Sequence, residues 1–220
     1  MVSLISYSQN LNTDRSDGNS LMDMIAFCAR VSNPSNQNNT ETSEKLIRYL
    51  IKNNHWSPFE MVHACLEITT TRDIARQILR HRSFSFQEFS QRYADPTKDL
   101  KFVTRDARLQ DSKNRQNSIE TEDADLNLNW ETQQKYVVDT ALKTYRWAID
   151  HGIAKEQARA VLPEGITESK LYMSGTIRSW IHYIGLRSGK ETQKEHRQIS
   201  LECAKAISPV FPMISEFVSQ

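Results

Sequence analysis

A stretch of fourteen residues, Arg80–Tyr93, holds the densest set of side chains in the chain that could do chemistry. Its sequence, RHRSFSFQEFSQRY, contains three arginines, one histidine, one glutamate, two glutamines, three serines and a tyrosine. Arginine forks and hydroxyl groups that converge on one point suit a phosphate. The single carboxylate, Glu88, suits a ribose hydroxyl or a ring N–H. The stretch therefore predicts a nucleotide or phosphate site, although neither GxGxxG nor GxxxxGK[ST] occurs.

The residues just before this stretch form the first element that must position it. Periodic apolar residues predict a helix over Arg72–Arg82. On that helix Arg72, Arg76 and Arg80 fall at i, i+4 and i+8 and share one face. Two interpretations of Arg72 and Arg76 stay open. They serve the predicted site, or they belong to a solvated face near a helix end, where cations are favoured.

The alternation of Phe84, Phe86 and Phe89 is expected to anchor the backbone while the polar side chains stay available. The same interleaving of arginine and aromatic residues fits an alternative function, a non-catalytic module that binds RNA or nucleotides by stacking. A formal net charge of +1 argues against nucleic-acid binding driven by charge. A metal-dependent hydrolase is a weaker alternative, because the 6 histidines show no HxH, HExxH or HxxxD spacing.

Composition places these residues in a folded protein. The chain has 220 residues, 38% hydrophobic and 25% charged, which is enough for a sizeable core. Only 6 glycines and 6 prolines occur, so long helices are expected. No run approaches about 18 apolar residues, and the N-terminus lacks signal-peptide features. The 3 cysteines form no CxxC motif, so we expect a cytoplasmic protein without disulfides or a cysteine-rich metal site.

Hydrophobic periodicity predicts the rest of the framework. An edge strand is expected over Met1–Gln9, and a strand with alternating faces over Phe59–Thr70. Ser32–Thr42 is expected to be a loop, and Thr104–Asn127 a polar loop or excursion. The predicted helices are Ser20–Val31, Ser43–Asn53, Leu128–Asp150 (followed by Gly152), Ala154–Leu162, Ser174–Leu186 and Thr192–Ile207.

Residues Arg80–Tyr93 resemble the signature of the flavin-dependent thymidylate synthases, the ThyX family, usually written RHRxxSxNExSxRY. One signature position differs, because Gln87 stands where the family usually has asparagine; the amide is kept and reaches further. The resemblance covers most of the chain and is weakest over Thr104–Asn127. No role is assigned to Glu191, which stands where many members have histidine. Other segments that resemble the family in the same order are Ala29–Ser32, His55–Glu60, Glu156–Arg159 with Leu162 and Pro163, Arg178–Arg187, Gln193 and Glu195.

The resemblance implies both a fold and an activity. The fold is α+β, a single mostly helical catalytic domain over residues 1–220 with a small antiparallel sheet. The activity is conversion of dUMP to dTMP, in which methylenetetrahydrofolate supplies the carbon and FAD, reduced by NADPH, supplies the hydride. Such methyltransferases are homotetramers whose active sites lie where subunits meet. The expected location is the cytoplasm, or the host cytoplasm if the chain is viral, with no nucleic-acid or membrane partner.

The resemblance also assigns residues to ligands, and it implies no metal site. The expected FAD contacts are Ser57, Arg80, His81, Arg82, Glu88, Thr176, Arg178 and His182. The expected dUMP contacts are Gln77, Arg80, Glu88, Ser90, Gln91, Arg92, Arg159 and Arg187.

Four of these assignments have alternatives. His182 is an expected FAD contact, or it is a core histidine with its polar atoms satisfied. By resemblance Arg187 is the catalytic residue, because a guanidinium at the pyrimidine edge stabilises charge that develops on the ring; alternatively it is a cation at a helix C-terminus. Arg159 is an expected phosphate partner, or it pairs with Glu156 at i, i+3. Ser90 could be a nucleophile, but His81 lies nine residues earlier and no orienting group is evident. We therefore expect Ser90 to position dUMP, with no nucleotide bound covalently to the enzyme.

Overall fold

A computed structural model describes residues 1–9 and 20–219, and the packing divides the chain into two compact units. The first unit contains Met1–Ile68, His81–Phe86 and Tyr172–Gln220. The second unit contains Thr69–Arg80 and Gln87–Leu171. The single domain expected over residues 1–220 stays a prediction.

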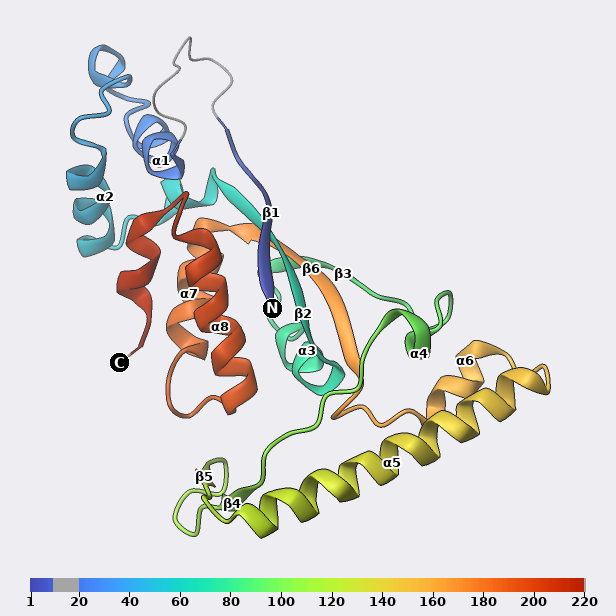
Figure 1. Ribbon diagram of the computed structural model, residues 1–220. Helices are drawn as coiled ribbons and strands as arrows, with labels where there is room; N and C mark the ends of the chain where they lie inside the picture. Colours follow the sequence, from blue (N-terminus) through green and yellow to red (C-terminus); the bar gives the residue numbers. More distant parts are fainter. Residues whose placement is uncertain (10–19, 220) are drawn as a thin grey trace. The chain divides into compact units, whose positions relative to one another are not determined.

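A four-stranded sheet has the order β1-β2-β6-β3 (Figure 1). Its edge strand β1 (Val2–Tyr7) pairs antiparallel with β2 (His63–Thr71), so that Leu4 lies opposite Leu66. The other two strands are β6 (Glu168–Thr176) and β3 (Phe84–Glu88). The expected edge strand is confirmed, and so is the α+β class with a small antiparallel sheet. The strands β2, β3 and β6 each have residues in both units.

Helices pack around an apolar core in the first unit. α7 packs against α8, and α8 also contacts β1 (Figure 1). The indole N–H of Trp180 donates to the carbonyl of Ala64 at 3.0 Å and thereby fixes α7 to β2. The helices are α1 (Leu21–Ala29), α2 (Ser43–Lys52), α7 (Ile177–Arg187) and α8 (Lys194–Ile207). Fully buried core side chains include Leu21, Ile25, Ile47, Phe59, Leu66, Trp180, Tyr183, Ile207 and Phe211.

The second unit is built around one long helix, α5 (Ala124–Asp150), which packs against α6 (Lys155–Ala158) (Figure 1). Asp123 caps the start of α5 by accepting from the N–H of Leu126. After the helix, Gly152 has φ +75°, as expected of a glycine that follows a helix end. The remaining elements are α3 (Arg72–Ile78), α4 (Pro96–Asp99), β4 (Arg108–Gln110) and β5 (Ser118–Glu120). A small core contains Tyr145, Ala148, Ala158 and Leu162, with Phe102 and Ile149 packed against it.

A buried amide joins α5 to the extended segment that contains Arg105. Gln134 is 5% exposed. Its Oε1 accepts from the main-chain N–H of Arg105 at 2.9 Å, and its Nε2 donates to the carbonyl of the same residue at 2.8 Å. Both polar atoms of the amide are therefore paired, which is what burial of such a group requires.

Several predicted elements differ from the structure. The helix expected over Arg72–Arg82 ends at Ile78, because the N–H of Arg80 donates to the carbonyl of Gln77 in a tight last turn. Arg80 therefore lies beyond the helix. The helix expected to begin at Ser174 begins after Thr176, because that residue is its N-cap and accepts from the N–H of Ser179 at 3.1 Å.

The preceding residues form β6, a strand that the sequence analysis did not predict. The strand expected over Phe59–Thr70 begins at His63, after a short 3-10 helix over Ser57–Glu60. The segment Thr104–Asn127, expected to be a loop, contains the β4–β5 hairpin and the first turn of α5.

The described part of the chain contains no helix that is both long enough and apolar enough to cross a membrane. Cys28, Cys65 and Cys203 are all free thiols.

Candidate functional site

The signature segment Arg80–Tyr93 contributes residues to both units. His81–Phe86 lie in the first unit, whereas Arg80 and Gln87–Tyr93 lie in the second. The residues predicted to contact FAD consequently lie mostly in the first unit, and those predicted to contact dUMP mostly in the second.

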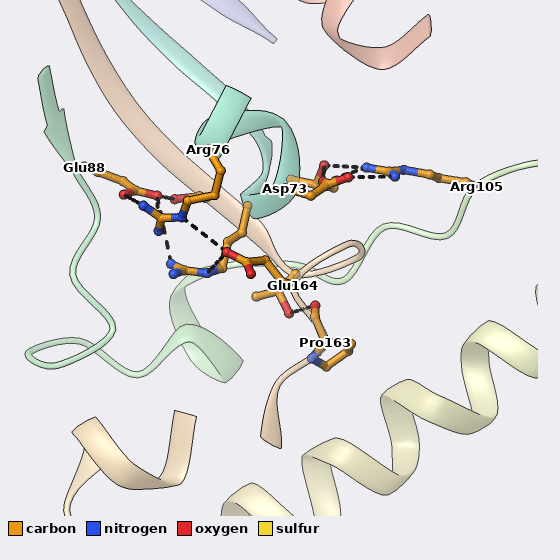
Figure 2. Close-up of polar contacts among 10 residues, drawn as sticks. Asp73, Arg76, Glu88, Arg105, Pro163 and Glu164 are labelled. Atoms are coloured by element: carbon orange, nitrogen blue, oxygen red, sulfur yellow. Dashed lines mark hydrogen bonds and ion pairs between the residues drawn. The ribbon is translucent and has the colours of Figure 1, made fainter. Parts of the chain in front are cut away.

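The signature acid, Glu88, is held by three neighbours at the end of β3 (Figure 2). Its side chain is 17% exposed. The hydroxyl of Ser169 donates to Glu88 Oε1 at 2.9 Å, and Arg76 Nη1 lies 3.2 Å from Oε2. Arg72 Nη1 lies 3.9 Å from Oε1. These contacts hold the carboxylate of Glu88 in one orientation.

A second carboxylate, Glu164, shares the same two arginines (Figure 2). Arg76 Nε lies 3.2 Å from Glu164 Oε1, and Arg72 Nε lies 4.0 Å from it. Burial lowers the pKa of Arg72, and Arg76 acts in the same direction, whereas Glu88 and Glu164 raise it. The solvated-face interpretation is therefore wrong for Arg72, whose side chain is 16% exposed, and both arginines form an ion cluster around the signature acid.

Another ion pair fixes the start of α3 in the second unit (Figure 2). The two terminal nitrogens of Arg105 lie 2.9 and 2.8 Å from the carboxylate oxygens of Asp73. Arg105 also donates to the hydroxyl of Thr71 at 2.7 Å. Because the main chain of Arg105 is held by Gln134, this bidentate pair connects the helix that carries Arg76 to α5.

Two predicted phosphate partners meet at Glu156. Arg92 Nε lies 3.5 Å from Glu156 Oε2, and Arg159 Nε donates to the carbonyl of Glu156 at 3.3 Å. Arg159 thus bonds the main chain, while the carboxylate pairs with Arg92. The neighbouring Gln91 is 3% exposed, and its Nε2 has no hydrogen-bond partner among residues 1–9 and 20–219. The two arginines at Glu156 suit an anionic ligand.

The backbone between these residues forms a tight turn. The N–H groups of Tyr93 and Ala94 both donate to the carbonyl of Ser90 at 3.1 Å. The hydroxyl oxygen of Ser90 accepts from the N–H of Arg92 at 3.4 Å. Lys155 donates to the carbonyl of Tyr93 at 2.9 Å, a contact that no sequence pattern indicated.

In the first unit, a cavity of about 530 Å³ combines an apolar wall with a few polar groups. Arg178 is oriented there by Glu60, whose Oε1 accepts from Arg178 Nη1 at 2.8 Å. Ser57 lines a neighbouring hollow of about 570 Å³, which also includes Trp56 and Arg178. Volume and lining both suit an aromatic cofactor with a charged part. The cavity is lined by Trp56, Glu60, Ser83, Arg178, Ser179, Ile181 and His182.

Thr176 has a structural task besides its predicted contact, because it caps α7. The hydroxyl of Ser179 in turn donates to the carbonyl of Ser83 at 3.1 Å, which holds part of the signature segment against the start of α7. Arg178 and His182 lie one turn apart on α7 and both line the cavity, as their spacing predicted.

The predicted catalytic residue, Arg187, is the last residue of α7. Its Nε donates to His81 Nε2 at 2.9 Å. Arg187 is therefore a cation at a helix C-terminus, as the alternative interpretation proposed, and it also has a specific partner in the signature segment. The bond uses the inner nitrogen and leaves both terminal NH₂ groups for other partners.

An aromatic cluster lies next to His81. The rings of His81 and Tyr183 meet edge to face with centroids 4.9 Å apart. The hydroxyl of Tyr183 lies 3.1 Å from Nε2 of the fully buried His196. Burial lowers the pKa of His196 to about 3, with Arg187 and His81 acting in the same direction, so His196 is neutral near pH 7. Burial also raises the pKa of Tyr183.

Phe84 belongs to the same packing. Its ring lies 4.8 Å from that of Trp180 and 6.0 Å from that of Tyr183. A Cβ added at Gly175 would lie 2.4 Å from Phe84 Cδ1, so glycine is needed there for the ring to fit. Phe84 therefore anchors the backbone as predicted, and a ring packed in this way is a poor platform for nucleic-acid bases.

Sequence reasoning missed four residues that hold the predicted site residues. The structure brings Arg178 and His182 together, Arg92 together with Arg159, and Arg187 together with His81. Arg80 and Arg82 are exposed, and Gln77 lies in the last turn of α3. Across the described ranges no group of three or more His, Cys, Asp or Glu is placed to hold a metal ion. The missed residues are Ser169, Glu164, Tyr183 and His196.

Comparison with known proteins bears on this arrangement. A sequence model of the family described as thymidylate synthase complementing protein, Thy1, matches residues 19–213. The chain belongs to the Thy1 family. It is 46% identical over 198 residues to the probable flavin-dependent thymidylate synthase of Paramecium bursaria Chlorella virus 1, which covers 90% of each chain.

Two further Thy1 relatives carry the same kind of name. The flavin-dependent thymidylate synthase of a Synechocystis species is 48% identical over 192 residues, 87% of this chain and 86% of that protein. That of Kosmotoga olearia is 31% identical over 188 residues, 86% of this chain and 81% of that protein. Membership of the Thy1 family confirms the resemblance first seen in the signature segment. The assignment of single residues to ligands stays a prediction.

Proposed function

We propose that this chain is a flavin-dependent thymidylate synthase that converts dUMP to dTMP with methylenetetrahydrofolate as the carbon donor. FAD, when bound and reduced by NADPH, supplies the hydride. The observation that carries the proposal is that Arg92 and Arg159 both contact Glu156, in a chain of this family. Two arginines that contact the same exposed residue are suited to bind a nucleotide phosphate.

The nucleotide site is proposed to lie at the turn after β3. Arg92 and Arg159 would bind the phosphate by displacing their contacts with Glu156, which are exposed and therefore weak. Ser90 would position the nucleotide, and Glu88 would accept a hydrogen bond from it in the direction set by Arg76 and Ser169. The other proposed dUMP contacts are Gln77, Arg80, Gln91 and Arg187.

The flavin is proposed to occupy the cavity of the first unit. Trp56 and Ile181 offer it apolar surface, and Arg178 and His182 offer charge and hydrogen bonds. Ser57 borders the adjoining hollow, which would take the rest of the cofactor. The other proposed FAD contacts are Arg80, His81, Arg82, Glu88 and Thr176.

Arg187 is the residue we propose to activate the substrate. C5 of uracil is a poor nucleophile until negative charge on the ring is stabilised. A guanidinium at the pyrimidine edge provides that stabilisation without a proton transfer. Because the bond to His81 uses Nε, the terminal NH₂ groups of Arg187 are the ones that would face the ring.

Assembly and location belong to the same proposal. The homotetramer with active sites at subunit contacts rests on the resemblance in the signature segment. A cytoplasmic location rests on the three free thiols, Cys28, Cys65 and Cys203, because thiols persist where the environment is reducing.

The test is a complete reaction with purified protein, FAD, NADPH, methylenetetrahydrofolate and dUMP. We expect dTMP, identified by mass spectrometry, only when all four small molecules are present. Protein that binds flavin and oxidises NADPH but forms no dTMP would refute the proposal.

Matched arginine variants separate the role of Arg187 from a general loss of charge. Arg187→Ala should keep bound flavin and NADPH oxidation but form little dTMP. Arg146→Ala, which removes an exposed arginine from α5, should behave like the wild type. Wild-type dTMP formation by Arg187→Ala would remove this residue from the catalytic role.

A further inference from the structure

We infer that Tyr183 and His196 are positioning residues that hold His81, and through it Arg187, in the orientation needed for dTMP formation. This inference rests on the proposed function, because its effect is measured on that reaction. Neither Tyr183 nor His196 is among the residues that the resemblance assigns to a ligand.

The first link is the bond between Arg187 and His81. Arg187 Nε donates to His81 Nε2 at 2.9 Å. A guanidinium has no acceptor, so His81 Nε2 must be unprotonated and its ring proton must sit on Nδ1. The bond fixes the long arginine side chain near its end. Without it, several rotatable bonds would let the terminal NH₂ groups move away from any one direction.

The second link is the contact between His81 and Tyr183. The two rings meet at 84° with centroids 4.9 Å apart, the edge-to-face geometry that aromatic pairs prefer. Tyr183 is fully buried and also contacts the rings of Trp180 and Phe84. It therefore gives His81 a rigid surface to pack against.

The third link is the hydrogen bond that sets the orientation of Tyr183. Its hydroxyl lies 3.1 Å from His196 Nε2, and both residues are fully buried. His196 comes from α8, whereas Tyr183 and Arg187 lie on α7. The ring of His196 also lies 6.4 Å from that of His81, edge on. The Tyr183–His196 hydrogen bond therefore joins α7 to α8 next to His81, the residue that holds Arg187.

The charge state of the pair matters to Arg187. A protonated His196 would place a buried cation near the guanidinium of Arg187 and repel it. Burial, Arg187 and His81 all oppose that proton, which keeps His196 neutral. A neutral, hydrogen-bonded pair can thus support a catalytic cation without competing with it.

The test uses a variant that removes both partners at once, Tyr183→Phe/His196→Leu. Replacing both members of a buried pair with apolar groups is close to neutral for stability, whereas a single change leaves a buried polar atom unpaired. We expect dTMP formed per NADPH oxidised to fall about tenfold, because small misplacements of a catalytic group have effects of that order or larger. NADPH oxidation and bound flavin should stay near wild-type values. If the double variant loses its flavin, Tyr183→Phe, which keeps the His196 ring and removes only the hydroxyl, gives the same measurement.

The same double change made in the Arg187→Ala variant distinguishes a positioning role from general structural support. In Arg187→Ala, the double change should lower the residual dTMP no further, because the residue it acts through is absent. The control Tyr172→Phe removes an exposed hydroxyl that donates to Glu67 at 2.8 Å and should leave the ratio unchanged.

Two outcomes would overturn the inference. One is a wild-type ratio of dTMP to NADPH in the double variant. The other is a parallel fall of NADPH oxidation and dTMP formation in both backgrounds, which would show structural support alone. Failure of the proposed function would give a different result from failure of this inference alone. Wild-type protein would then bind and reduce flavin without forming dTMP, and the inference would be refuted as well.

Discussion

Acidification should destabilise this protein through one buried imidazole. His196 is fully buried, and its folded-state pKa is lowered from 6.5 to about 3 by burial first, then by Arg187 and His81. In the unfolded chain the same histidine takes up a proton near pH 6.5. Between these values the unfolded state binds more protons, so the free energy of unfolding falls as the pH falls. The loss is about 1.4 kcal/mol for each pH unit, or about 2 kcal/mol at pH 5 relative to pH 7.

The assay is urea unfolding followed by tryptophan fluorescence at pH 7 and pH 5, at one fixed protein concentration. Other groups also titrate in this range, so the quantity of interest is the difference between wild type and Tyr183→Phe/His196→Leu. The double variant should lose about 2 kcal/mol less than the wild type on acidification. His151→Gln changes an exposed histidine and should retain the wild-type pH dependence. Equal pH dependence in the wild type and the double variant would refute a neutral, buried His196.

Three further outcomes are expected. Gly175→Ala should lower the free energy of unfolding by about 1–3 kcal/mol in a thermal melt, since its Cβ would overlap the packed ring of Phe84; an unchanged melting temperature would contradict this. Ser90→Ala should weaken dUMP binding in a titration yet retain some turnover, whereas normal affinity with no chemistry would point to a nucleophile. Ser169→Ala should cost about 1–2 kcal/mol in urea unfolding, because it removes a hydrogen bond to the partly buried Glu88, and a wild-type midpoint would speak against that bond.

Sequence could predict those elements of the fold in which the apolar side chains are also the buried ones. In β2, the alternate residues Ala64, Leu66 and Ile68 are apolar and are also buried, so the period of two was visible. In β6 the inward positions include Ser169 and Gly175, which carry little or no apolar surface. Only Leu171 and Met173 on that face carry large apolar side chains, and two alternate positions are too short a pattern to indicate a strand.

The candidate site also contains some residues that sequence could predict and others that it could not. The signature segment could be recognised because its polar residues are contiguous. The residues that hold it come from distant positions: Glu164 lies 88 residues from Arg76, and Ser169 lies 81 residues from Glu88. Tyr183 and His196 lie on different helices and look like ordinary core residues until the Tyr183 hydroxyl is seen 3.1 Å from His196 Nε2. Only tertiary structure brings such partners together.

The amide of Gln134 limits which substitutions the long helix α5 can accept at this position. Its Oε1 and Nε2 pair with the N–H and carbonyl of Arg105 as a neighbouring strand residue would, and Nε2 also donates to the carbonyl of Trp130 at 3.3 Å. Glutamate has the same length but would aim a carboxylate at a carbonyl oxygen, and asparagine is one methylene too short to span the gap. A single position on a largely solvent-facing helix is thus as narrowly specified as any residue of the hydrophobic interior.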